Sequence, residues 1–175
     1  MEGNFTNDTI DISLLPRFED TKLTSIEPDY WKVIVFNTLF TYIIFIAASA
    51  AVVYFIEELH PYILYIVLFY LLLITVTLII YRISFKNKGY AFRTHDVIYK
   101  AGAIAVTTHI IPYNRVQHAA LHEGFVSRRF GLASIEVFTA GGVNGDIRIR
   151  GIKKEEAETM KQLLMGKVTN PVVNE

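Results

Sequence analysis

An uninterrupted apolar run from Tyr62 to Tyr81 constrains this chain more than any other feature. Its twenty residues contain no charge, Gly or Pro, fourteen of them are Leu, Ile, Val or Phe, and Arg82 ends the run. At a rise of about 1.5 Å per residue, a helix of this length matches the roughly 30 Å hydrocarbon core of a bilayer. Each of the fourteen side chains favours insertion by about 0.3–0.6 kcal/mol. The run therefore predicts a membrane-spanning helix rather than a long core helix of a soluble protein.

A second run of twenty-four uncharged residues, Val33–Ile56, is also long enough to span a bilayer with some tilt. It follows Tyr30-Trp31-Lys32, which is typical of an anchor at the headgroup level. Small side chains at positions 47–51 predict where the two helices pack, because helices in lipid associate through close packing of small residues. The polar residues of this run suit hydrogen bonds between the helices or the lining of a path: Asn37, Thr38 and Thr41.

The five residues Glu57–Pro61 join the two runs, so the sequence predicts an antiparallel helical hairpin. This link has no Lys or Arg, whereas basic residues flank the other ends of both helices: Lys32, Arg82, Lys86, Lys88 and Arg93. Because positive charge is retained in the cytoplasm, both termini are expected to be cytoplasmic. The hairpin would make the protein a multi-pass membrane protein.

The rest of the chain is large enough for one small domain. Residues 1–29 are acidic and polar, which predicts a flexible amino-terminal arm that lacks the pattern of a signal peptide. Residues 82–175 carry fourteen Lys or Arg against eight Asp or Glu, an excess of +6 that is modest for a protein that binds nucleic acid. The absence of cysteine excludes disulfides and thiolate metal sites.

After Arg82 the hydrophobic period becomes two-fold, which is typical of half-buried strands. Turn residues separate seven predicted strands, at 82–85, 90–93, 97–100, 104–110, 116–121, 134–139 and 146–150. Lys153–Met165 then has the apolar period of a helix, and Gly166 is the expected stop. The fold class is therefore an α+β membrane protein: a helical hairpin, then an antiparallel β-sandwich or partly open barrel closed by a carboxyl-terminal helix.

Several motifs resemble the bacterial pleckstrin-homology-like (PH-like) domains that are found beside membrane helices. They are Ile111–His118 (IPYNRVQH), Gly124–Ala133 (GFVSRRFGLA), Thr139-Ala140-Gly141, and Gly151-Ile152 before Glu155-Glu156-Ala157. The resemblance covers residues 30–165 and implies a PH-like fold on the cytoplasmic face of a bacterial plasma (inner) membrane. It also implies a membrane-protein partner that carries related domains, or self-association. Glu123 stands where the family commonly has Gln.

These observations together predict four segments. They are a flexible acidic arm (1–29), a transmembrane hairpin (30–81, with spans 33–56 and 62–81), a cytoplasmic PH-like domain (82–166) and a tail (167–175).

No catalytic constellation, phosphate-binding loop or dinucleotide motif stands out, so we expect neither an enzyme nor a cofactor. The cluster at 141–145 is expected to be a hairpin turn. His118 and His122 are four apart on a predicted strand, about 13 Å, which is too far for one metal ion. Basic and polar side chains are the candidate contacts to lipid or a partner: Arg82, Lys86, Lys88, Arg115, Gln117, Arg128 and Arg129. Plain solvated charge is the alternative for the basic residues, and an internal hydrogen bond is the alternative for Arg115 and Gln117.

The sequence favours a non-enzymatic membrane adaptor whose PH-like domain binds a protein, or an anionic lipid, at the cytoplasmic face. The alternative is a subunit of an oligomeric pore or transport complex. Transport sites usually keep charged residues or broken helices within the membrane, and neither span has a charge, Gly or Pro.

Overall fold

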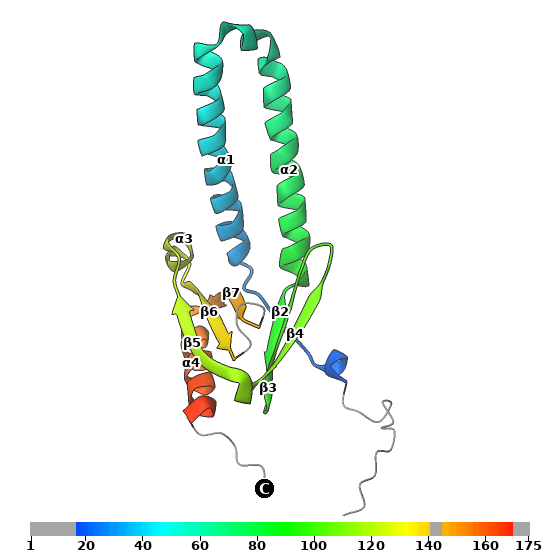
Figure 1. Ribbon diagram of the computed structural model, residues 1–175, viewed down its shortest axis with the longest axis vertical. Coiled ribbons are helices and arrows are strands. Elements are labelled where there is room, and N and C mark those ends of the chain that lie inside the picture. The colour runs from blue at the N-terminus through cyan, green and yellow to red at the C-terminus, as the bar shows by residue number, and fades with distance from the viewer. Residues whose placement is uncertain (1–16, 141–144, 170–175) are drawn as a thin grey trace, which may run out of the picture.

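The computed structural model describes residues 17–140 and 145–169, and it consists of a long helical hairpin above a small β domain (Figure 1). The hairpin is α1 (Tyr30–Phe55), a short 3-10 helix (Glu57–Tyr62) and α2 (Ile63–Asn87). The domain contains seven strands among the described residues, together with α3 (Phe125–Arg129) and α4 (Lys154–Thr169). The fold class expected from the sequence is confirmed.

The two long helices expose most of their apolar side chains, because nothing but the partner helix covers them. Both are long and apolar enough to cross a membrane. A few hydrogen bonds join them: the Tyr42 hydroxyl lies 2.8 Å from Thr77 Oγ1, and the Ser49 hydroxyl bonds to that of Tyr70. These contacts lie along the facing sides of the hairpin. Ser49 belongs to the small-residue run that the sequence analysis expected at the helix contact.

The base of the hairpin differs from the prediction in one respect. Residues 82–85 were expected to form a strand, and this is wrong, because α2 continues through them to Asn87. The extra turn is packed against α1: the Phe85 ring lies 6.0 Å from that of Trp31, and the guanidinium of Arg82 lies 4.9 Å from the Trp31 ring. Aromatic and cation–π contacts of this kind stabilise the helical conformation there.

The strands form two antiparallel sheets. One has the order β1-β2-β3-β4, made of Thr24–Ser25, Gly89–Phe92, Asp96–Ala101 and Thr107–Pro112. The other has the order β5-β6-β7, made of Val116–His122, Leu132–Thr139 and Ile147–Lys153. The two pack as the sandwich that the sequence predicts. The turn expected at 141–145 lies outside the described residues except for Gly145.

The first strand comes from residues assigned to the arm. Thr24 and Ser25 pair with Tyr90 and Gly89 of β2, and Ile26 beside them is only 4% exposed. The segment is bound further by the Glu27 amide, which donates to the Gly151 carbonyl oxygen at 3.0 Å. The last part of the arm is thus a component of the β domain and leads directly into α1.

The core lies between the sheets and α4. Ile98, Ile135 and Ile149 are almost fully buried, as are Ala157 and Leu164 of α4. This face of α4 is the one that the sequence predicts, although the helix does not end at Gly166 but continues to Thr169. Gly can occupy a helix interior at a cost of roughly 1 kcal/mol relative to Ala, so it is only a weak stop signal.

Tyr90 is part of this core and is 4% exposed. Burial, with smaller contributions from the carboxylates of Glu156 and Glu27, raises the pKa of Tyr90 to about 12. The neutral phenol is therefore the form that the folded domain favours.

Candidate functional site: a cavity between the helices

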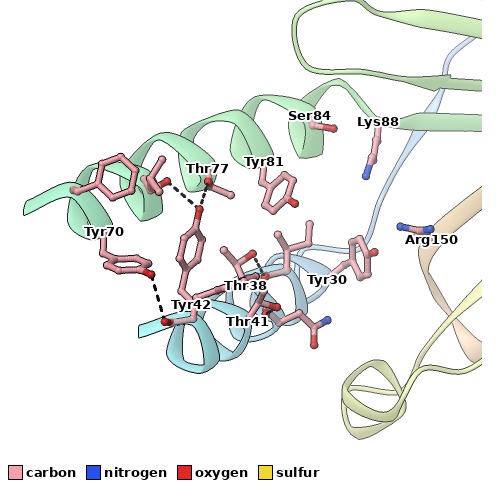
Figure 2. A pocket seen from close by; sticks show the side chains of 15 residues that line it. Tyr30, Thr38, Thr41, Tyr42, Tyr70, Thr77, Tyr81, Ser84, Lys88 and Arg150 are labelled. Carbon is pink, nitrogen blue, oxygen red and sulfur yellow. Dashed lines mark hydrogen bonds between the residues drawn. The ribbon is translucent and has the colours of Figure 1, made fainter. Parts of the chain in front are cut away.

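A cavity of about 760 Å³ lies between α1 and α2 and opens toward the β domain (Figure 2). Polar side chains line much of it, including Asn37, Thr38, Thr41, Tyr42, Thr77 and Ser84. Two of the threonine hydroxyls donate within their own helix, Thr38 to the Ile34 carbonyl oxygen at 2.8 Å and Thr41 to that of Asn37 at 2.9 Å. Phe45, Phe69 and Leu73 line it on the helix turns farther from the β domain, together with Tyr70, whose hydroxyl bonds to that of Ser49. The cavity therefore becomes more apolar along the helices but keeps one hydroxyl at the far part.

Three side chains from different elements meet at the end of the cavity nearest the domain. Tyr30 begins α1, Lys88 follows α2, and Arg150 belongs to β7. Figure 2 shows the ends of these side chains gathered at this mouth. The Tyr30 ring can lie there because it packs on Gly151, where a side chain would meet it.

The mouth is strongly cationic. Lys88 is half-buried, and both burial and the positive charge of Arg150 lower the pKa of its ammonium group. Other basic residues of the domain have carboxylate partners, for example Lys153 with Glu27 at 3.6 Å. Among the ion pairs of the described residues, none involves Lys88 or Arg150. Two cations thus face each other with no negative charge between them.

The structure does not gather the seven sequence-predicted contact residues in one place. Lys88 lies at the cavity mouth, Arg82 is stacked on Trp31, and Lys86 is exposed in the last turn of α2. Arg128 and Arg129 are exposed on α3, which lies beside α1. Arg115, which ends the 3-10 turn Tyr113–Arg115, and Gln117 of β5 are exposed. β5 is the edge of its sheet opposite to β7, the strand that carries Arg150. The roles of the seven residues in binding stay predictions.

Sequence reasoning missed Arg150. The alternating pattern of Asp146–Arg150 correctly predicts a strand with a polar face, but Arg148 and Arg150 look equivalent in it. In the structure Arg148 lies 3.9 Å from Glu136, whereas Arg150 turns to the cavity. The roles of Arg148 and Arg150 differ only because the base of the hairpin lies next to Arg150, and the strand pattern carries no signal of this. Glu123, in the place where the family commonly has Gln, forms an ion pair with Lys154 at 3.0 Å.

A second feature is the outer edge of β4, which no other strand of the described residues covers. Ile110 on this edge is 41% exposed. A shallow groove of about 420 Å³ runs beside it and is lined by His109, Pro112, Arg115 and Thr139 among others. An open strand edge presents unpaired amide and carbonyl groups and is a template for pairing with another strand.

A third feature is a pair of exposed apolar side chains beside the hairpin base. Ile104, in the turn between β3 and β4, is 93% exposed, and Phe125, the first residue of α3, is 85% exposed. The turn is fixed to the end of α2, because the Asn87 side-chain amide donates to the carbonyl oxygens of Gly102 and Ala103 at 3.1 and 3.4 Å. Figure 1 shows this turn beside α2 and α3 beside α1, so the two lie on opposite sides of the hairpin.

Among the described residues, no group of three or more His, Cys, Asp or Glu side chains is close enough to hold a metal ion. His122 Nε2 lies 2.9 Å from Glu136 Oε2, near enough for an ion pair when the imidazole is protonated, although the contact lacks the angles of a hydrogen bond.

The hairpin, the sandwich and the closing helix define a membrane protein that carries a PH-like domain. A family description, bacterial PH domain, matches residues 35–168, and the chain belongs to this family. It is also similar to the UPF0699 transmembrane protein YdbS of Bacillus subtilis (strain 168), with 28% identity over 88 residues. That alignment covers 50% of this chain and 54% of the relative, so the chain matches about half the length of that protein. No solved structure matches the chain.

Proposed function

We propose that this protein is a non-enzymatic membrane adaptor, whose PH-like domain binds a strand of a protein partner along the free edge of β4. The partner is a membrane protein with a related domain or a second copy of this chain. The observation that carries the proposal is the β4 edge, which no strand of the described residues covers, on a domain that follows directly from a membrane hairpin. Backbone pairing along such an edge supplies affinity, and pockets beside it supply specificity.

The composition of the β4 edge supports a regulated contact rather than indiscriminate aggregation. Thr107, Thr108 and His109 are polar, Pro112 ends the strand, and Ile110 is the one large aliphatic side chain exposed on it. Short edges with polar residues and Pro resist uncontrolled pairing. The neighbouring Arg115 is exposed and offers a charge to an acidic group on the incoming chain.

The charge distribution supports a cytoplasmic position for the domain. Lys32, Arg82 and Lys86 flank the domain end of the hairpin, whereas Glu57 and Glu58 lie at the opposite end. Positive charge at the domain end favours retention of that end in the cytoplasm. A reporter fused after Glu175 should stay protected from reagents added outside intact cells, and labelling there would reverse this orientation.

Photo-crosslinking in intact membranes tests the adaptor function. A photoreactive amino acid at Ile110 should give a discrete crosslinked protein band, whereas the same group at Lys161, which is exposed on α4, should not. Because a Lys on an edge strand opposes pairing, Ile110→Lys should abolish the band obtained from a photoreactive group placed at Thr108. Equal crosslinking at the two faces, or no crosslinked band at β4 in native membranes, would refute the proposal.

A further inference from the structure

The cationic mouth of the cavity between α1 and α2 has no counter-ion within the described chain. Lys88 is half-buried and lies close enough to Arg150 for that charge to lower its pKa. Burying a cation such as Lys88 is unfavourable unless it is paired, and the exposed Arg150 beside it adds a second positive charge that repels the first. Such an arrangement is stabilised when an anion binds between the two groups.

The donors at the mouth match the oxygen atoms of a phosphate. Arg150 offers a planar fork of N–H donors, Lys88 a compact ammonium group and Tyr30 a hydroxyl, and the three come from separate elements that converge on one point (Figure 2). Guanidinium groups bind phosphate oxygens in a bidentate manner, and ammonium groups bind them as point charges.

The cavity behind the mouth has the polarity of a lipid seen from its headgroup toward its chains. Ser84 and Tyr81 lie next to the mouth, and the hydroxyl groups of Thr77 and Tyr42 follow. Phe45, Phe69 and Leu73 come from the helix turns farther from the mouth, where Tyr70 adds one hydroxyl that is bonded to Ser49. The mouth itself is level with the hairpin base, where Trp31 and Arg82 mark the headgroup region. The cytoplasmic leaflet is rich in anionic phospholipids, which basic residues at this depth attract.

We propose that Lys88, Arg150 and Tyr30 bind a phosphate ester at the mouth of this cavity. In the membrane this ligand is the phosphodiester of an anionic phospholipid, with part of an acyl chain in the apolar end of the cavity. The inference goes beyond the adaptor function, since neither the β4 edge nor its partner takes part in it.

Native mass spectrometry of the full-length protein in detergent, titrated with phosphatidylglycerol or phosphatidylcholine, tests the site. The double variant Lys88→Gln/Arg150→Gln should weaken phosphatidylglycerol binding by about ten-fold or more, because two charge-assisted contacts are lost. The matched control Lys100→Gln/Arg148→Gln removes the same charge from positions of the same domain that do not line the cavity and should weaken it by less than about two-fold. Phosphatidylcholine should bind more weakly and respond to neither pair.

Competition separates the two sources of phosphate. Inorganic phosphate and glycerol 3-phosphate that displace the lipid only weakly indicate a lipid site, whereas displacement at similar concentrations indicates a site for a soluble phosphate ester. Either result upholds the phosphate site. Equal loss of binding in the two double variants would mean diffuse charge attraction and would overturn the proposal. It would also be overturned if none of the four probes bound: phosphatidylglycerol, phosphatidylcholine, inorganic phosphate and glycerol 3-phosphate. Circular dichroism confirms that each variant is folded.

Discussion

Gly151, in β7, lies against the start of α1, and a single added methyl group there should destabilise the contact between the β domain and the helical hairpin. Its φ is +78°, and a Cβ atom would lie 2.4 Å from Tyr30 Cγ and 2.7 Å from Ile26 Cγ2. Real Cβ contacts are not so short, and the obstructing atoms include Tyr30 Cβ, also at 2.7 Å, which no side-chain rotation moves, so the start of α1 itself would have to shift. Gly151→Ala should therefore loosen this contact as well as the domain.

The size of the effect follows from two contributions. A non-glycine residue in the left-handed region costs roughly 1–2 kcal/mol, and overpacking of a filled site costs typically 1–3 kcal/mol more. The expected loss for Gly151→Ala is thus about 2–5 kcal/mol. Gly131 is the matched control, because it also has a positive φ, +65°, but a Cβ there would meet nothing within 4 Å. Gly131→Ala should cost only the first contribution, about 1–2 kcal/mol.

Thermal unfolding of the purified full-length protein, followed by circular dichroism, measures the difference. For a domain of this size each kcal/mol lowers Tm by about 4–8 °C, so Gly151→Ala should unfold well below Gly131→Ala. The fluorescence of Trp31, the only tryptophan in the sequence, should shift in the Gly151 variant alone, because Trp31 lies in the first turn of α1. Equal Tm values and an unchanged Trp31 spectrum in both variants would refute the steric argument.

Three further predictions concern the membrane surface, the core and the hairpin. Because the chain has no cysteine, single-cysteine variants can carry an environment-sensitive fluorophore. Labels at Ile104 and Phe125 should be shielded by lipid from a water-soluble quencher, whereas a label at Lys161 should be quenched. Equal quenching at all three positions would contradict contact of Ile104 and Phe125 with the membrane. Below pH 10, the usual pKa of tyrosine, the neutral Tyr90 phenol should contribute fully to the stability of the domain. As pH rises from 10 toward 12 the free energy of unfolding should fall by roughly 3 kcal/mol, because ionisation of the buried phenol is unfavourable in the folded state. Tyr90→Phe should flatten this part of the stability–pH curve, and an unchanged slope would exclude Tyr90 as its source. Tyr42→Phe removes a hydrogen bond between the helices and should lower resistance to dodecyl sulfate unfolding by about 0.6 kcal/mol, with a stability equal to the wild type counting against the bond.

The parts of the fold that the sequence predicts well are those with local determinants. The hairpin follows from two uncharged runs, and six strands and α4 follow from periodicity that is visible within a few residues. The failures lie where distant contacts decide. Residues 82–85 alternate like a strand but are helical because Phe85 packs on Trp31, and β1 has only two residues, so its pairing with β2 leaves no periodic signal.

The motif at Ile111–His118 illustrates how far a resemblance informs function. Ile111, Tyr113 and Val116 are buried, and the Tyr113 hydroxyl donates to the Arg93 carbonyl oxygen at 2.6 Å. The Arg115 carbonyl oxygen accepts a hydrogen bond from the Ala140 amide at 3.0 Å. These contacts hold the corner between the two sheets, so the spacing of apolar and polar residues in this motif is explained by folding. The side chains of Arg115 and Gln117 are exposed and take no part in these contacts.

The candidate phosphate site could not be found in the same way, because its members come from three separate parts of the chain. Tyr30 begins the hairpin and Lys88 follows it, so their separation in space is set by how α1 and α2 pack. Arg150 is brought to them only because Gly151, the next residue, accepts the Tyr30 ring against its backbone. A ligand bound by these three side chains would therefore bridge both helices and β7. The contact between β7 and the start of α1, which Gly151 makes possible, is the same contact that a bound phosphate would stabilise. Occupancy of the cavity would therefore affect how the β domain is held below the membrane.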